Sequence, residues 1–522
     1  MKGKVATTVL GSGIGSTRGD SLQQLEAHWR NSDKRSAWNV IRNENRWRRV
    51  WNTSTLLHAT LSLDLAALEA HAQHGPSGLP SLLGLLAQRG QAARRLWLHS
   101  EGEQLRMADV LRLVAPPLQS VFLGAGAPPA SCQLLLCRFP GLRSLDLPAA
   151  ACSASTGLAG FEQLEELTLR EGAPPALLSS LAGLPLLRLL SLTIAGEAVP
   201  HRELGALHRL EELHVYLAPS TPARFDFQPS ALAALRRLRC VLLIATSSLC
   251  ESLTLGPGLA GLPSLQELQV DGQVDRLPCD LWACQHLTRL DLDLKCSATL
   301  PPAPEAHASA PALLPALQEL RLVGCRLPGG ALPPAVCQLA GLRRLEVQRC
   351  GLTSGCLHHG LPHQISQLEQ LTHLSLAGNS LSSLAPLAAL PALRHLDCSA
   401  NPLTWLPPGP YLGLLEALLL SATSITVVPP VLCAASRLEV LDLSGLPGLE
   451  LSLRDVQCTL ARMPRLSLLL LGKQAACQGA APGGPPGLEW RTPSVAALVA
   501  LGQALPRLQV DFEHTAAEFE GL

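Results

Sequence analysis

The sequence has little of several things that usually mark a function. Hydrophobic residues make up 47% of its 522 residues but aromatic ones only 3%, so its core must be built mainly from Leu, Ala and Val. Lys plus Arg and Asp plus Glu are equal at 41 each, which gives no general attraction to nucleic acid or to an anionic membrane. No stretch reaches the ~18 uninterrupted apolar residues of a membrane span. A chain of this length suits several domains or one extended repeat array.

Cysteine is present, but not in a pattern that predicts disulfides or a metal cluster. The 16 Cys residues are scattered from Cys132 to Cys477, and no two form a C-x-x-C pair. Secreted disulfide scaffolds are short and Cys-dense, so reduced thiols that pack as small apolar side chains are expected here. The first residues hold only a short apolar run and are weak as a secretory signal. These features predict a reducing compartment, and we expect a cytoplasmic protein.

A leucine pattern returns along most of the chain. The motif is L-x-x-L-x-L, with Val sometimes at its third apolar position, and about sixteen copies follow one another between residues 93 and 472. Successive copies begin at Leu371, Leu393 and Leu415, and the commonest spacing is 22 to 23 residues. The L-x-L part has a period of two, so each copy predicts a short strand with one buried face.

Two further features recur in register with the leucines. A side chain three residues after the third apolar position can hydrogen-bond the unpaired backbone of a turn. The residues found there are Cys325, Cys350, Asn379, Asn401 and, once, Thr423. Beyond the turn, segments such as Leu332–Leu342 and Leu361–Leu371 begin with Leu-Pro and carry an apolar residue at every third position. Pro at the start and this spacing predict one or two helical turns.

These three recurring features resemble intracellular leucine-rich-repeat proteins of the plant and Ras-interacting type, over roughly residues 93 to 472. The composition, heavy in Ala, Gly and Pro, is similar to that of repeat proteins of green algae. The resemblance implies an α/β solenoid, a horseshoe with a parallel sheet on its concave side and short helices or turns on its convex side.

The remaining chain divides around this array. We expect the following parts: a flexible leader at 1–19, a helical segment or N-terminal cap at 20–64, linking helices at 65–92, a Gly/Pro-rich loop at 473–490, and a C-terminal cap and tail at 491–522. The cap should combine a helix near Ser494–Leu505 with a final strand near Leu508–Phe512. Within the array, residues 217–229 and 300–312 are rich in Pro, Ala or Gly and are predicted to be loops.

Residues 20–64 concentrate tryptophan and arginine. Their second half resembles an F-box, which has a basic residue and Trp, an apolar residue three positions on, a small polar residue, and then Leu and an aromatic before the first strand. The residues that fit are Arg46, Trp47, Val50, Ser54 and Leu57, and His58 replaces the aromatic. No Leu-Pro opens the first half, on which adaptor binding in that family depends. The resemblance implies a substrate receptor of a cullin-type ubiquitin ligase; the alternative is a helical cap.

Three other patterns are better explained without a chemical site. A group with zinc-ligand side chains includes Cys350, which belongs to a repeat turn, and Gly360 and Pro362 prevent one helix from aligning its histidines. The group is Cys350, Cys356, His358, His359 and His363. The Gly-rich run that begins at Gly11 lacks the last Gly of a dinucleotide loop.

Basic and aromatic residues before position 64 would suit nucleic acid, but a helix with Trp inside and Arg outside also explains them. We predict no catalytic residue, metal or cofactor.

The outward residues of the strands form the candidate binding surface. They flank the second and third apolar positions and should face the concave side, where sixteen strands at ~4.8 Å each span roughly 70–80 Å. That length accommodates a standard interface of about 800 Å² per partner. We expect the contact to centre on residues 210–347, with Tyr216 as its aromatic anchor. The candidates are Glu212, His214, Tyr216, Glu267, Asp271, Arg289, Asp291, Asp293, Glu319, Arg321, Arg344, Glu346, His373, His395 and Asp397. Outward apolar residues near the ends should be covered by caps: Trp97, Phe122, Leu419, Leu468 and Leu470.

These features favour binding over catalysis. We expect a monomeric, non-enzymatic scaffold that binds a partner protein through its concave face and has neither a nucleic-acid partner nor a membrane span. The alternative is an F-box-type receptor, for which a ubiquitin-ligase adaptor would be a partner. Cytoskeletal, axonemal or nuclear locations are alternatives to the cytoplasm.

Overall fold

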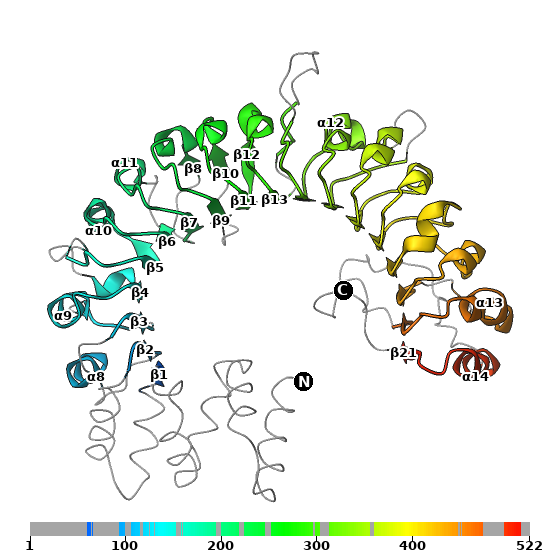
Figure 1. Ribbon diagram of the computed structural model, residues 1–522, viewed down its shortest axis with the longest axis horizontal. Helices are drawn as coiled ribbons and strands as arrows, with labels where there is room; N and C mark the ends of the chain where they lie inside the picture. The colour runs from blue at the N-terminus through cyan, green and yellow to red at the C-terminus, as the bar shows by residue number, and fades with distance from the viewer. Residues whose placement is uncertain are drawn as a thin grey trace, which may run out of the picture. The chain divides into compact units, whose positions relative to one another are not determined.

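A computed structural model gives the architecture of most of the repeat array (Figure 1). It describes residues 60–63, 65, 93–99, 106–114, 118–124, 126–129, 131–152, 158, 160–194, 200–218, 224–245, 252–295, 298–302, 313–354, 360–446, 449, 451–472 and 495–512. The chain forms two units, residues 1–168 and 169–522, each of which is considered by itself. The predicted leader, the linking helices after residue 65, the loop at 473–490 and the tail after 512 lie outside the described residues. So do the F-box-like residues Arg46, Trp47, Val50, Ser54 and Leu57.

Unit 1 contains a ribbon of parallel strands. The strands β1 (Thr60–Leu63), β2 (Arg95–Leu98), β3 (Ser120–Leu123) and β4 (Ser144–Pro148) pair in chain order. Two α-helices and a 3-10 helix follow strands of this ribbon: α8 (Met107–Leu113), α9 (Ser131–Arg138) and η1 (Ala149–Ala151). The alternating pattern of each strand buries its inward leucines and valines, as predicted.

The sheet begins earlier than the leucine motif predicts, although the F-box resemblance implies a first strand soon after His58. Its first described strand is β1, whereas we expected the array to begin near residue 93 and residues 20–64 to be helical. Leu61 and Leu63 provide the inward pair of this strand. His58 occupies the first apolar position of the motif, so the repeat is incomplete there and the pattern does not reveal the strand.

Unit 2 is a curved stack in which parallel strands line the inner side and short helical segments lie on the outer side (Figure 1). Each strand of its main sheet pairs in parallel with the next. These strands are β6 (Leu189–Ile194), β7 (Glu212–Leu217), β9 (Cys240–Ala245), β11 (Glu267–Asp271), β13 (Arg289–Asp293), β14 (Glu319–Val323), β15 (Arg344–Gln348), β16 (His373–Ser375), β17 (His395–Asp397), β18 (Ala417–Leu419), β19 (Val440–Asp442), β20 (Leu468–Leu470) and β21 (Gln509–Asp511). The strand β5 (Glu166–Ala173) includes the boundary at which the chain is divided.

Equivalent leucines of neighbouring repeats stack directly on one another. Leu320 of β14 pairs in register with Leu290 on one side and Leu345 on the other, and Leu374 and Leu396 continue the row. None of these five side chains is more than 2% exposed. A core of this kind depends on close aliphatic packing between repeats, which explains how the chain folds with few aromatic residues.

The outer segments are short α-helices and 3-10 helices, in agreement with the predicted one or two helical turns. Pro278, Pro333, Pro362 and Pro429 each stand at the N-cap of one of them. The segments are α10 (Pro175–Leu178), η2 (Ser179–Gly183), α11 (His201–Leu204), η3 (Pro229–Leu232), η4 (Leu259–Gly261), η5 (Cys279–Ala283), η6 (Pro328–Gly330), α12 (Pro334–Cys337), η7 (His363–Gln367), η8 (Ala385–Ala389), η9 (Pro410–Leu414), η10 (Pro430–Ala434), α13 (Leu453–Cys458), η11 (Leu460–Arg462) and α14 (Val495–Ala504). The helix α14 and the strand β21 confirm the elements predicted for the C-terminal cap.

Within the described ranges, no helix is both long and apolar enough to cross a membrane.

A second, smaller sheet was not predicted. The strands β8 (Arg224–Phe227), β10 (Ser252–Leu255) and β12 (Val274–Arg276) pair in parallel, with β10 in the middle. Phe225 and Phe227 are buried in it, so the prediction of a loop over 217–229 is wrong for this stretch. An F-x-F alternation only four residues long, close to Pro222 and Pro229, is too short to be recognised as a strand from sequence.

An asparagine side chain completes the turn between two repeats. The Nδ2 of Asn379 donates to the carbonyl oxygens of Leu376 at 2.8 Å and Val347 at 2.7 Å. Its Oδ1 accepts from the backbone N–H groups of Cys350 at 3.0 Å and Leu352 at 3.1 Å. The predicted role of this position in satisfying turn backbone is confirmed, and the structure adds that three of these four partners belong to the preceding repeat.

The other residues at the turn position do the same with fewer bonds. Asn401 donates to Leu376 O at 2.9 Å and accepts from Leu381 N at 3.0 Å, again reaching one repeat back. The thiol of Cys350 donates to Leu322 O at 3.3 Å. Thr423 donates only to Leu420 O, at 2.9 Å, within its own turn. Asparagine therefore links successive repeats more completely than cysteine or threonine does.

Replacing Asn379 should destabilise the array strongly. The substitution Asn379→Ala leaves the buried N–H groups of Cys350 and Leu352 and the carbonyl oxygen of Val347 without this partner, while Leu376 O keeps Asn401. We expect the free energy of unfolding to fall by about 3 kcal/mol or more. Urea denaturation followed by circular dichroism measures this. Ser382→Ala, an exposed position in the same repeat, is the control and should change stability by less than ~0.5 kcal/mol. Equal effects of the two substitutions would refute the role assigned to Asn379.

Candidate functional site

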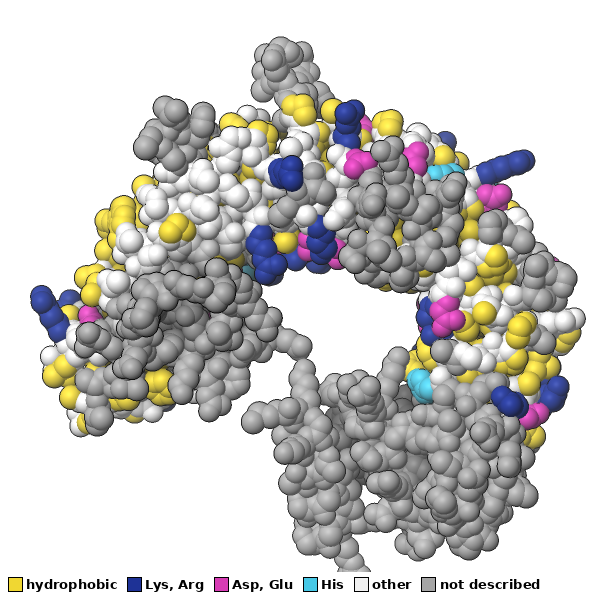
Figure 2. Space-filling view, turned by 180° about the vertical axis from the view of Figure 1, so that it is seen from behind, with side chains coloured by type: hydrophobic (Ala, Val, Ile, Leu, Met, Phe, Trp, Pro, Cys, Tyr) yellow, Lys and Arg dark blue, Asp and Glu magenta, His cyan; other side chains and the backbone are white. Residues whose placement is uncertain are grey.

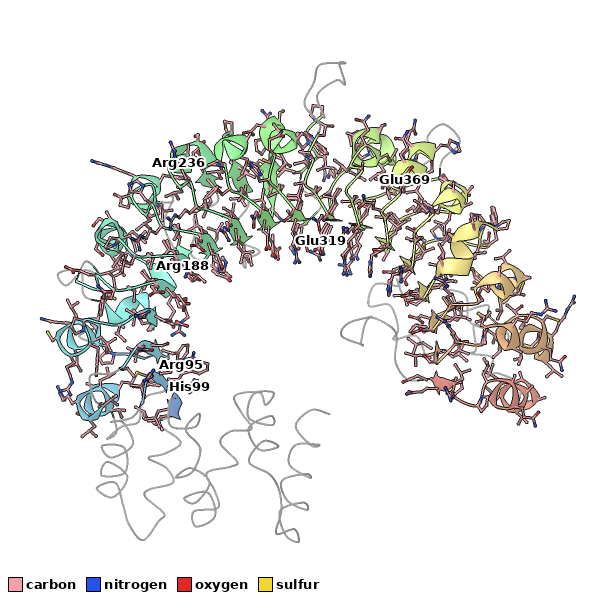
Figure 3. The ribbon with its side chains drawn as sticks, in the orientation of Figure 1. Arg95, His99, Arg188, Arg236, Glu319 and Glu369 are labelled. Atoms are coloured by element: carbon pink, nitrogen blue, oxygen red, sulfur yellow. The ribbon has the colours of Figure 1, made fainter. Side chains whose placement is uncertain are left out.

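The candidate residues lie on the inner side of the strands in unit 2. Glu319 projects from the inner side of the curve, while Arg236 lies away from it (Figure 3). Oppositely charged side chains lie next to one another along the inner rim (Figure 2). This placement follows from strand geometry, since successive side chains alternate between the buried and open faces.

Strand register arranges these side chains in rows, which we number from the N-terminal end of the strands. The first row is Glu212, Cys240, Glu267, Arg289, Glu319, Arg344, His373 and His395. The second row is His214, Leu242, Gln269, Asp291, Arg321, Glu346, Ser375 and Asp397. The third row begins Tyr216, Ile244, Asp271 and Asp293. All fifteen predicted concave residues lie in these rows.

Four of the predicted residues form a continuous ion-pair chain across three strands. Arg321 contacts Asp291 at 2.7 Å and Glu346 at 3.3 Å, and Glu346 also accepts from Arg344 at 2.7 Å. Asp291 is only 6% exposed. Burial acts to lower the pKa of Arg321, but its hydrogen bond to Asp291 and the charge of Glu346 outweigh this and raise that pKa. The pairing therefore keeps a partly buried cation charged.

Hydrogen bonds extend this chain over two more strands, beginning with the Gln348 amide, which donates to Glu346 at 3.5 Å. Gln348, at the end of β15, donates to the Ser375 hydroxyl at 3.0 Å, and that hydroxyl donates to Asp397 at 2.9 Å. The other carboxylate oxygen of Asp397 accepts from the Ser399 N–H at 3.0 Å. Side chains from β13 to β17 are thus fixed by one another on the open face of the sheet.

Lys295 belongs to the site although the sequence prediction omitted it. Its Nζ lies 2.9 Å from Asp271 and 3.3 Å from Asp293, which are neighbours in register. The hydrogen bond to Asp271 raises the pKa of Lys295. Like charges opposite each other destabilise a sheet, so the neighbouring carboxylates of Asp271 and Asp293 favour a cation close by. Their equivalent positions in the motif could have pointed to Lys295.

Two histidines stack at the first positions of β16 and β17. The rings of His373 and His395 are nearly parallel, at 5°, with centroids 4.2 Å apart. Burial, reinforced by the neighbouring His395 and Arg344, lowers the pKa of His373 to about 4. Burial also lowers the pKa of His395, although Glu416 acts against this. Both rings are therefore neutral near pH 7.

The strand β9 contributes residues that sequence reasoning missed. Its outward side chains are Cys240, Leu242 and Ile244, and all three are half-buried rather than polar. Ile244 is in register with Tyr216 of β7, the predicted aromatic anchor. The motif does place these residues on the open face, because the repeat begins at Leu238. They were not predicted as binding residues because they are apolar.

The outward apolar residues near the ends are covered to different degrees. In unit 2, Leu470 is buried, whereas Leu419 and Leu468 stay partly exposed. In unit 1, Trp97 and Phe122 are also partly exposed, and their ring centroids lie 6.0 Å apart. Leu470 is thus fully buried, and the expectation that caps cover all five residues stays a prediction, because much of each cap lies outside the described residues.

The described residues contain no group of three or more His, Cys, Asp or Glu side chains that could hold a metal ion. Of the zinc-ligand types singled out above, Cys350 and His363 are described, and Cys356, His358 and His359 lie outside the described residues. From β13 to β15, the ionisable side chains of the inner surface are neutralised by one another.

Comparison with known proteins supports the same architecture. The family of leucine-rich repeats, in its two-copy form, matches residues 369–408. A leucine-rich-repeat protein of Leptospira interrogans matches with a TM-score of 0.51 and 19% identity over 82% of this chain and 98% of its own. TLR13, in its complex with ssRNA13, matches with a TM-score of 0.51 and 18% identity over 81% of this chain but only 59% of its own length. These likenesses concern the fold alone, and no curated protein sequence matches the chain.

The depressed pKa of His373 predicts a pH dependence of stability. A histidine in an unfolded chain has a pKa of about 6.5, whereas that of His373 in the fold is about 4. As the pH falls through this interval, the unfolded state binds the proton first, so the contribution of His373 to stability is lost. We expect His373→Asn to flatten the fall of the urea midpoint between pH 6.5 and 4. His286→Asn, at an exposed histidine, is the matched control, and an unchanged slope in His373→Asn would contradict the prediction.

Proposed function

We propose that this leucine-rich-repeat solenoid is a non-enzymatic scaffold whose inner surface binds another protein. The observation that carries the proposal is the continuous polar chain from Asp291 to Asp397, which lies on the open face of the sheet. Its side chains are held by one another before any partner arrives. A surface that is already ordered loses little conformational entropy on binding.

The pattern of charge along this surface supports a protein as the partner. Acidic and basic side chains alternate in the first row, where Glu267, Arg289, Glu319 and Arg344 follow one another on neighbouring strands. A surface of mixed sign selects a partner with the complementary arrangement and gives specificity more than general affinity. A nucleic acid, in contrast, would be favoured by a stripe of one sign.

A photo-crosslinker placed on each side of the solenoid tests this proposal. We expect p-benzoylphenylalanine at Glu319, on the inner surface, to capture a partner protein from eukaryotic lysate under ultraviolet light. The same residue at Arg236, away from that surface, is the matched control and should capture much less (Figure 3). Mass spectrometry identifies the captured protein. Capture at Arg236 with none at Glu319 would overturn the proposal.

A second candidate function is the receptor subunit of a cullin-type ubiquitin ligase. The observation in its favour is that β1 begins at Thr60, two residues after His58, which is the order that the F-box resemblance implies. The intact chain should then retain the ubiquitin-ligase adaptor and cullin from lysate, and Trp47→Ala should lose both while keeping the partner captured at Glu319. Absence of the adaptor from both samples would eliminate this candidate.

A further inference from the structure

We propose that the inner face of β7, β9 and β11 is the docking site for an apolar–basic segment of the partner, in which an apolar side chain stands between two Lys or Arg residues. This inference rests on the proposed function and identifies the kind of segment that the surface fits. It is carried by an apolar strip on β9 and by two open carboxylates, one on either side of it.

The strip is apolar at successive outward positions. Leu242 and Ile244 point to the open face of β9, and Tyr216 lies in register beside Ile244. All three are half-buried, while the inward residues Val241 and Leu243 are at most 2% exposed. A strand that is apolar on both faces is typical of a sheet covered on both sides. Covering this side would remove further apolar surface from water, which favours association.

Two carboxylates flank the strip at its N-terminal end. Cys240 is in register with Glu212 on one side and Glu267 on the other, and both carboxylates are exposed. Burial, with added repulsion from these two carboxylates, raises the pKa of Cys240 to about 11, so its thiol is neutral. In this part of the first row, the negative charge therefore comes from Glu212 and Glu267 and not from Cys240.

Neither glutamate is neutralised by a strong cation. Glu267 has no ion pair among the described residues, in contrast to the carboxylates of β13 and β15. The nearest group to Glu212 is His214, at 3.8 Å, and burial lowers the pKa of that histidine, which leaves it uncharged near pH 7. A partner cation placed at either position would gain an ion pair without displacing one that already exists.

The cations nearest the strip are engaged with other carboxylates. Arg188 is held by Glu211 at 3.0 Å and Lys295 by Asp271 and Asp293. Arg289, the register neighbour of Glu267, lies 3.7 Å from Glu319. Arg237 and Arg239 act on Glu211.

The spacing of the two glutamates limits the sequence of the segment. They stand two strands apart, which is roughly 10 Å. An extended chain advances ~3.3 Å per residue and turns every second side chain to the same face, so residues that both face the sheet stand two or four positions apart. The segment that fits therefore carries basic residues four positions apart, whose long side chains reach the two glutamates, with an apolar side chain midway between them that reaches Leu242 and Ile244.

Selection from a phage library of random dodecapeptides on the immobilised full-length chain tests the inference. We expect enriched peptides to carry Lys or Arg four positions apart, with an apolar residue midway between them. Their binding, measured by fluorescence anisotropy, should weaken at least tenfold in Glu212→Gln/Glu267→Gln and in Leu242→Asp/Ile244→Asp, and should weaken as salt is raised. Glu369→Gln, an exposed carboxylate away from the strip, is the control and should bind as the unaltered chain does.

Several outcomes would overturn the inference. They are enrichment of acidic peptides, enrichment of none, and binding that survives in both double variants. The glutamine variant replaces exposed side chains by ones of the same shape, so its result stands even if the aspartate variant fails to fold. If crosslinking at Glu319 captures a partner while the selection fails, only this inference falls. If neither inner position engages a protein, the proposed function falls with it.

Discussion

In-register parallel pairing of the repeats is the constraint on which the rest of the molecule depends. It stacks Leu290, Leu320 and Leu345 on one another inside the sheet. Because side chains alternate along a strand, the same register places Asp291 beside Arg321 on the open side. A slip of one residue would exchange the two faces and bury the charges. The order of charged residues on the inner surface is therefore fixed by the packing of the leucines behind them.

The inner surface of unit 2 has two regions of different character. From β13 to β17, donors and acceptors satisfy one another, as in the contact between Arg321 and Asp291. This region presents a partner with a preformed shape and charge pattern, but it has few donors or acceptors without a hydrogen bond. From β7 to β11, apolar side chains lie among carboxylates that lack strong partners, such as Glu267. The first region suits recognition of shape and charge, and the second has more to gain when a partner covers it.

The sequence predicted the strands well where the leucine motif is complete, because burial on one face requires that alternation. The motif did not reveal β1, where His58 interrupts it, or β8, whose alternation covers only four residues. Outward residues could be named from the motif, but their contacts could not. Repeat length varies, from 22 residues between Leu371 and Leu393 to 30 between Leu287 and Leu317, yet equivalent motif positions stay in register. What has to come from the structure is the reach of side chains outside the motif, such as the contact of Lys295, which follows its strand, with Asp271.

The asparagine bridges have a consequence for how such an array can change in length. Asn379 satisfies the turn of the repeat before it, so a repeat is completed by the one that follows. If a whole repeat with Asn at its turn is duplicated, the turns before and after it both keep their hydrogen bonds. An insertion that moves Asn379 away from Cys350 would instead leave backbone N–H groups of the preceding turn without an acceptor. The side chain of Thr423 is too short to bond the preceding repeat and donates only within its own turn, so the two repeats at this position are not joined by such a bridge. Duplication in evolution is thus accommodated in whole repeats, counted from one asparagine to the next.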